Sequence, residues 1–297
     1  MKIGDIIKNR GSSLSFEFFP PKDEAGEARL FQNITKLKAL GPTFVSVTYG
    51  AGGGTMKNTS RVIGRIERES SLTAMPHLTC VDQSKGELGK ILEDYKGEGI
   101  ENVLALRGDP PKGTEEFVAP KDGFCYAIDM VTLAVAVGGF SIAVAVYPEG
   151  HPESPSPEKD MYYTKQKIDA GADFAITQMF FDNGYFYQFL ERAEKAGITI
   201  PIIPGIMPIS DIARIRRFSQ MCGATLPDKI VRRLEKAGAG EAGKVGIEVA
   251  TEQCADLLEH GVRYFHFYTL NQADAVSRIV ANLGLESLGL VPPAKAR

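Results

Sequence analysis

The sequence predicts an α/β protein of the (β/α)8-barrel class, the TIM barrel. Segments with strand and helix patterns alternate from one end of the chain to the other, and eight of them have strand character. Strands such as VLALRG (103–108) and SIAVAVYP (141–148) are apolar on both faces, which is typical of parallel strands covered by helices. Eight such repeats indicate a closed barrel. An open, doubly wound sheet shows the same alternation and remains the alternative.

The expected strands end at turns or at polar residues. The first stops at Pro20 and Pro21, and the second runs into the glycine-rich turn Gly50–Gly54. The strands are expected at Ser13–Phe19, Thr43–Tyr49, Ala74–Thr79, Asn102–Leu106, Ser141–Tyr147, Phe174–Gln178, Ile200–Pro204 and Tyr264–Tyr268. The helices between them have apolar residues at helical spacing. They are expected at Glu24–Leu40 and at about 85–97, 122–137, 158–170, 184–196, 209–221, 245–260 and 272–283.

The whole chain, residues 1–297, is expected to form one barrel domain, because such barrels run to about 250 residues or more as one unit. An irregular insertion is expected near 222–243, and the tail 291–297 is expected to fray. The insertion contains GAGEAG (238–243), which matches the dinucleotide fingerprint G-x-G-x-x-G. A basic, helix-like run precedes these glycines instead of a strand, so we interpret them as a loop that ends a helix.

Composition limits the partners and the compartment. The net charge is −3 and no basic stripe is present, so nucleic acid and anionic membrane surfaces are not expected as partners. The first residues, MKIGDIIKNRG, hold no apolar run of the length expected for a signal peptide, and no window is apolar enough for the span of a membrane. The four cysteines are scattered without a C-x-x-C pair, which argues against a metal site or a disulfide framework and indicates a cytoplasmic protein.

Polar residues gather where the expected strands end, which is where barrel enzymes carry their chemistry. The first strand carries Glu17 and the third carries His77. The other strand ends hold Thr48, Tyr49, Arg107, Gly108, Asp109, Tyr147, Glu149, His151, Thr177, Gln178, His266, Tyr268 and Asn271. Because a buried polar group costs free energy unless it has a partner, these positions predict a site.

Each of these residues also has a purely structural interpretation. Glu17 among apolar neighbours suits a general acid, or else it is a structural carboxylate paired with an arginine of the barrel. Gly108 between two charges permits close approach to a ligand, or the three residues form a capped turn with a surface ion pair. His77 is a ligand or, more commonly, a hydrogen-bonded core histidine. Gln178 suits the edge of a heterocycle, or it bonds the backbone.

Eight segments in this order resemble the methylenetetrahydrofolate reductases. They are SFEFFPPK (15–22), FVSVTYGAGG (44–53), PHLTC (76–80), LALRGDPP (104–111), AVAVYPEGHPES (143–154), KIDAGADFAITQMFFD (167–182), IPIIPGIMPI (200–209) and FHFYTLN (265–271). The resemblance covers nearly the whole chain. It implies a (β/α)8 barrel that binds FAD non-covalently and is commonly a homo-oligomer. It also implies reduction of 5,10-methylenetetrahydrofolate to 5-methyltetrahydrofolate, with hydride passed from NADH or NADPH through the flavin at one shared site.

The resemblance assigns roles to individual residues. It makes Glu17 the general acid that opens the folate ring, places Asp109 beside flavin and pterin, and makes Gln178 a contact of folate and nicotinamide. Phe218 matches an aromatic residue that stacks on either substrate, although a helix-core phenylalanine is the alternative. The flavin contacts that it implies are Thr48, Tyr49, Ala51, His77, Arg107, Gly108, Asp109, Ala127, Tyr147, His151, Asp160 and Lys167.

The sequence departs from the family pattern in three places. Gln272, an expected folate contact, stands where some relatives carry Arg or Lys, and Tyr163 and Gln166 replace Asn and Arg at flavin positions. The loss of a cation is expected to weaken FAD binding, so a flavin-independent reductase is the alternative. A lyase on a similar barrel would require a strand-end lysine or a metal cluster, and a non-catalytic barrel should lack the expected catalytic residues. No regulatory extension is expected.

Overall fold

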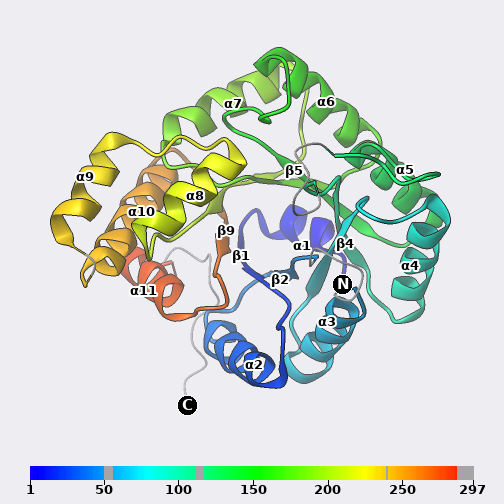
Figure 1. The fold of residues 1–297 in the computed structure, drawn as a ribbon, viewed down its shortest axis with the longest axis horizontal. Helices are drawn as coiled ribbons and strands as arrows, with labels where there is room; N and C mark the ends of the chain where they lie inside the picture. Colours follow the sequence, from blue (N-terminus) through cyan, green and yellow to red (C-terminus); the bar gives the residue numbers. More distant parts are fainter. Residues whose placement is uncertain (50–55, 111–116, 239, 286–297) are drawn as a thin grey trace.

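The computed structural model describes residues 1–49, 56–110, 117–238 and 240–285, and within them parallel strands form a ring surrounded by helices (Figure 1). The strands are β1 (Ser13–Phe18), β2 (Phe44–Val47), β3 (Ala74–Thr79), β4 (Asn102–Leu106), β5 (Ser141–Val146), β6 (Phe174–Thr177), β7 (Ile202–Ile203), β8 (Gly205–Ile206) and β9 (Tyr264–Tyr268). Their order is β7-β6-β5-β4-β3-β2-β1-β9-β8, and every described pairing is parallel. The predicted barrel is therefore confirmed, and the open sheet is excluded.

The seventh strand position of the barrel differs from the single strand expected at Ile200–Pro204. It consists of β7, which pairs with β6, and β8, which pairs with β9, so that together they close the ring. Pro204 lies between β7 and β8 and has no backbone N–H to donate to a neighbouring strand, which is why the strand is interrupted there. Its carbonyl still accepts a bond from the backbone of His266 at 3.0 Å.

The predicted helices surround the ring, and the described residues form three more. The helices are α1 (Ile3–Arg10), α2 (Glu24–Lys38), α3 (Met56–Ser70), α4 (Lys85–Gly97), α5 (Ala127–Val137), α6 (Pro157–Asp169), α7 (Asn183–Lys195), α8 (Ile212–Cys222), α9 (Asp228–Ala237), α10 (Ala242–Glu259) and α11 (Asp274–Leu283). Helices α1 and α3 are not predicted from the sequence, and α9 lies in the segment expected to be irregular. The helix expected from about residue 122 begins only at Ala127.

Helix α1 closes the bottom of the barrel, and Figure 1 shows it within the outline of the ring. Ile3 and Ile7 are fully buried and pack with Phe44, Met75 and other interior side chains, here called the lower interior cluster. The first backbone N–H groups of a helix have no partner within the helix. In α1, the backbone N–H of Ile3 donates to the side-chain oxygen of Asn102 on β4 at 2.7 Å. The lower interior is therefore apolar and sealed.

Short side chains fix the start of several helices on the opposite face. Asp23, Ser84, Ser156, Asp182 and Asp211 each accept a backbone N–H in the first turn of α2, α4, α6, α7 and α8. Each such cap contributes about 1 kcal/mol. The caps follow the strand ends directly, so they hold in place the loops at the C-terminal ends of the strands.

The segment expected to be an irregular insertion contains a regular helix, α9, between α8 and α10. The glycine motif at 238–243 joins α9 to α10, and in the described part of the chain a helix precedes it. The turn Gly50–Gly54 and the tail 291–297 lie outside the described residues.

Candidate active site

The upper half of the barrel interior is polar, in contrast to the lower interior cluster. Ser15 and Glu17 on β1, His77 on β3 and His266 on β9 are all buried. Ser15 pairs in register with His266, and Glu17 with Tyr268, so successive interior positions of β1 and β9 face each other. Side chains alternate between the two faces of a strand. This alternation places all of these groups on the inside of the ring.

Glu17 lies between two imidazoles. Its Oε2 is 3.5 Å from Nε2 of His77 and 3.5 Å from Nε2 of His266. Among the described residues, the basic groups within 4.0 Å of its carboxyl group are these two histidines and not an arginine, so the arginine-paired interpretation is wrong. Neither Nε2 has a hydrogen-bond partner. Desolvation lowers the pKa of His77 to about 4, although the nearby Glu17 opposes this shift. His77 is therefore neutral near pH 7 and is not a fully hydrogen-bonded core histidine.

A second group of charges lies over β4, β5 and the start of α6. Tyr147 and His151 are in edge contact, with ring centroids 4.6 Å apart. Burial lowers the pKa of His151, and the positive charge of Arg107 lowers it further. Burial also raises the pKa of Tyr147, and Asp109 adds to that rise. The structure thus brings these four predicted residues into one electrostatic neighbourhood.

Lys167 on α6 extends this group into the protein. Its Nζ donates to the carbonyl of Ala145 on β5 at 2.7 Å. Burial lowers the pKa of Lys167 to about 8, and the charge of Asp160 opposes the shift. Asp160 is buried, and desolvation raises its pKa. An ammonium has three donors, so Lys167 retains donors for an anionic ligand.

The turn after β4 is held from two sides. Arg107 makes a two-pronged ion pair with Glu153, with Nη2 2.7 Å from Oε1. Its partner is therefore Glu153 and not the neighbouring Asp109, which is exposed. Gly108 has φ +91°, and a Cβ there would lie 2.5 Å from Val81 and 2.9 Å from Thr79. Glycine is thus required by the backbone and by close packing.

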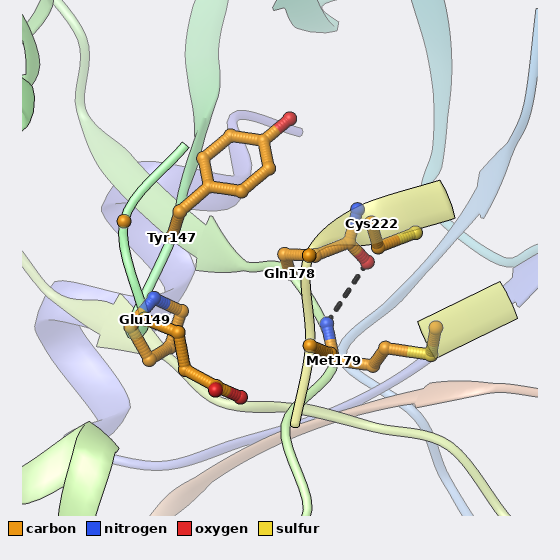
Figure 2. A pocket seen from close by; sticks show the side chains of 9 residues that line it. Tyr147, Glu149, Gln178, Met179 and Cys222 are labelled. Carbon is orange, nitrogen blue, oxygen red and sulfur yellow. Dashed lines mark hydrogen bonds between the residues drawn. The ribbon is translucent and has the colours of Figure 1, made fainter. Parts of the chain in front are cut away.

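A small pocket lies beside the second group, next to Tyr147. Tyr147 and Glu149 line one side, and Gln178, Met179 and Cys222 line the other (Figure 2). The side-chain oxygen of Gln178 accepts from the backbone N–H of Met179 at 2.9 Å. The backbone-bonding interpretation therefore holds for this oxygen, and the amide nitrogen is left as a donor for a ligand.

The remaining predicted residues are less closely connected. Burial raises the pKa of Tyr49, and the charges of Asp82 and Glu87 add to the rise. Its ring packs against the main hydrophobic core. Thr48 and Ala127 are half-buried at the rim, and Ala51 lies outside the described residues.

Phe218 and Gln272 lie at the edges of the site. Phe218 is half-buried on α8, one turn before the pocket residue Cys222, and the guanidinium carbons of Arg214 and Arg217 lie 5.3 and 5.7 Å from its ring centroid. Gln272 is exposed and donates its backbone N–H to Thr269. Neither side chain has a described contact with Glu17.

Ser15 was not selected from the sequence, whereas His266 and Tyr268 were named there only as polar residues of a strand end, without a role. Ser15 bonds His266, with Oγ 2.8 Å from Nδ1. Tyr268 donates its hydroxyl to the carbonyl of Thr177 at 2.6 Å, and so links β9 to the residue before Gln178. Ser15 lies two residues before Glu17 on the same strand, so period-two alternation would have identified it.

Comparison with known proteins is consistent with this geometry. A family model described as methylenetetrahydrofolate reductase matches residues 2–284. The Arabidopsis thaliana protein named methylenetetrahydrofolate reductase (NADH) 1 is 40% identical over 297 residues, which cover 96% of this chain and 50% of that protein. The Escherichia coli 5,10-methylenetetrahydrofolate reductase is 41% identical over 275 residues, 92% of this chain and 91% of that protein. The chain thus spans about half the length of its plant relative and most of the bacterial one.

The described residues show no other class of site. They contain no group of three His, Cys, Asp or Glu side chains placed to hold a metal ion. No helix among them is long and apolar enough to cross a membrane.

Proposed function

Because this chain belongs to the methylenetetrahydrofolate reductase family, we propose that it reduces 5,10-methylenetetrahydrofolate to 5-methyltetrahydrofolate with NADH or NADPH as the electron donor. The observation that carries this proposal is the buried carboxyl group of Glu17, held between two imidazoles on the inside of the catalytic face. A general acid must lie within hydrogen-bond reach of the atom that it protonates, directly or through one water. Plant relatives are named for NADH, which favours NADH as the donor.

The residues over β4, β5 and α6 fit FAD. Lys167 is a cation with unused donors, Arg107 is a second cation, and the glycine at 108 allows a ligand to approach the backbone. Together they suit a bound group that carries phosphates and a flat ring. FAD bound there would supply the hydride-accepting and hydride-donating chemistry of the reaction.

The replaced flavin contacts do not remove all positive charge from α6. Gln166 donates to the hydroxyl of Tyr162 at 3.0 Å. The ammonium of Lys159 lies 4.4 Å from the ring centroid of Tyr162 and 4.9 Å from that of Tyr163. The cation of Lys159 therefore stands on the same helix, two turns before Gln166, the position where some relatives carry arginine. This arrangement supports FAD binding over the flavin-independent alternative.

The chemistry of the protein side chains then follows from their positions. Glu17 donates its proton to a nitrogen of the five-membered ring of the folate, the adjacent carbon–nitrogen bond opens, and the electron pair of the broken O–H bond stays on the carboxylate. The proposal gives Asp109 and Gln178 the task of orienting pterin and nicotinamide, and Phe218 that of stacking on them. Gln272 would contact the folate tail through a neutral amide.

The test is the visible spectrum of the purified protein without oxygen. The band of an oxidised flavin should bleach with NADH and return after methylenetetrahydrofolate is added. In Glu17→Gln, bleaching by NADH should persist and recovery with the folate should fail. A protein that binds no flavin even after FAD is added, or a Glu17→Gln variant that recovers at the normal rate, would contradict this proposal.

A further inference from the structure

The polar contacts that lead from Phe265 through Ser15 and His266 to Glu17 can be given a direction from the carbonyl acceptor at their end. Ser15 donates its hydroxyl proton to the backbone carbonyl of Phe265 at 3.1 Å. A carbonyl oxygen can only accept, and a hydroxyl has one proton to donate. When the Ser15 proton is given to Phe265, the contact of 2.8 Å between Ser15 Oγ and His266 Nδ1 is made by a proton on Nδ1. Neutral His266 is thereby held as the Nδ1–H tautomer.

This tautomer leaves a lone pair on Nε2 of His266, directed at the carboxyl group of Glu17. The distance from Nε2 to Oε2 is 3.5 Å, and Nε2 has no other partner. The ring cannot turn away, because His266 is fully buried and stacks on Phe44 with centroids 5.8 Å apart. A carboxylate facing this lone pair would be repelled, whereas a protonated carboxyl group would donate to it.

His77 completes the arrangement from the opposite side. Its Nε2 is also 3.5 Å from Oε2 of Glu17, and it too lacks a partner. An oxygen that donates its own proton to one imidazole still accepts from another. Tyr268, which also faces Glu17 from β9, donates to the carbonyl of Thr177 and does not compete.

We propose that Ser15, His266 and His77 form a directed hydrogen-bond chain that keeps Glu17 in its protonated form between turnovers. The chain runs from His77 Nε2–H to Glu17 Oε2, from the Glu17 proton to His266 Nε2, and from His266 Nδ1–H to Ser15 Oγ. Ser15 and His266 are thus positioning residues for the general acid. The effect on catalysis rests on the proposed function, but the proton positions in the hydrogen-bond chain can be measured without any reaction.

The first measurement is the tautomer of each histidine, by nuclear magnetic resonance of the full-length protein with nitrogen-15 in its imidazoles. The chain has only four histidines, so single substitutions of the other two, His151 and His260, assist assignment. We expect a proton on Nδ1 of His266 and on Nε2 of His77. A His266 that carries its proton on Nε2 would overturn the proposal, whatever the enzyme catalyses.

The second measurement compares two serines on the same strand and the same face. Ser15→Ala removes the hydroxyl that accepts from Nδ1 of His266 in the proposed hydrogen-bond chain. Ser13→Ala removes a buried hydroxyl that has no hydrogen-bond partner. We expect Ser15→Ala to slow reoxidation of the reduced flavin by the folate about 10- to 100-fold, with flavin reduction by NADH changed less than about two-fold, because only the folate step takes a proton from Glu17. Ser13→Ala should match the wild-type protein in both steps and in the His266 tautomer.

Rescue by a conservative variant separates positioning from folding. Ser15→Thr keeps the hydroxyl group and should restore most of the folate step. A Ser15→Ala variant with a normal folate step would overturn the proposal, as would equal losses in Ser15→Ala and Ser13→Ala. If the wild-type protein shows no flavin chemistry at all, the proposed function fails, while the histidine tautomers still decide whether the chain exists.

Discussion

Helix α10 passes so close to the segment after β8 that only glycine fits at position 246. A Cβ added to Gly246 would lie 1.7 Å from the carbonyl oxygen of Ile209 and 2.6 Å from its carbonyl carbon. Both atoms belong to the backbone, so no side chain can rotate to relieve the contact. A separation of at least 3.0 Å requires the helix and the segment to move apart by 1.3 Å, the difference between 3.0 and 1.7 Å.

Two opposing effects determine the stability of Gly246→Ala. Alanine stabilises a helix interior by about 1 kcal/mol relative to glycine. Overpacking a core costs about 1–3 kcal/mol or more, and a contact with a rigid backbone belongs at the upper end of this range. We therefore expect a net loss of about 2 kcal/mol in the free energy of unfolding. For a chain of this length, that loss lowers Tm by about 3 °C.

Gly243→Ala is the matched control, because it lies in the first turn of the same helix with nothing within 4 Å of its added Cβ. It should be neutral or raise the free energy of unfolding by up to about 1 kcal/mol. Both variants are compared by scanning calorimetry and urea unfolding. If Gly246→Ala is as stable as Gly243→Ala, the close approach of α10 to Ile209 does not exist in solution.

Three further predictions concern charge and packing at the site and beside it. Hydrogen bonds from Arg61 and then Arg65 hold the pKa of Glu27 at about 2, below its ordinary 4.5. The stabilisation that this gives is present above pH 4.5 and is lost as the pH falls toward 2. In urea unfolding, Glu27→Gln should therefore lower the free energy of unfolding by about 1–2 kcal/mol at pH 7 and by almost nothing near pH 2. Burial lowers the pKa of Lys167 to about 8 from 10.5, so the FAD-free protein should gain stability as the pH rises from 8 to 10.5. Lys167→Met should remove this gain and raise the free energy of unfolding by about 1–3 kcal/mol at pH 7. In a fluorescence titration the same variant should bind FAD about 10- to 100-fold more weakly, and an unchanged FAD affinity would contradict the role assigned to Lys167. A Cβ at Gly205 would lie 2.4 Å from the carbonyl of Thr177 and 2.6 Å from the hydroxyl of Tyr268. Gly205→Ala should therefore break the hydrogen bond between Tyr268 and Thr177 and slow the folate step more than the NADH step. Equal effects on both steps would contradict the placement of Tyr268.

Most strands could be predicted from the sequence because their signal is local. Ala74–Thr79, Asn102–Leu106 and Tyr264–Tyr268 have the bounds that the sequence predicts, since a run of buried residues ended by a turn identifies such a strand without reference to its neighbours. Helix α1 has no comparable signal. It buries only Ile3 and Ile7, and their apolar partners come together only when the barrel has closed over them.

The site was predictable as a location but not as an arrangement. The position of Glu17, Asp109 and Gln178 at strand ends follows from the chain alone, because parallel strands place their carboxyl ends on one face. The burial of the Tyr49 hydroxyl without a hydrogen-bond partner could not be inferred in this way. It depends on packing against core side chains that come from distant parts of the chain.

The amino-acid sequence by itself determined the barrel, the face that carries the chemistry and the identity of the buried acid. Only the tertiary structure decided the partners of that acid. His266 is 251 residues from Ser15 in the chain, yet its Nδ1 lies 2.8 Å from the serine oxygen. The physical reason is closure of the ring: the register between β1 and β9 sets which side chains meet inside it, and a shift of one residue would turn each of them to the other face.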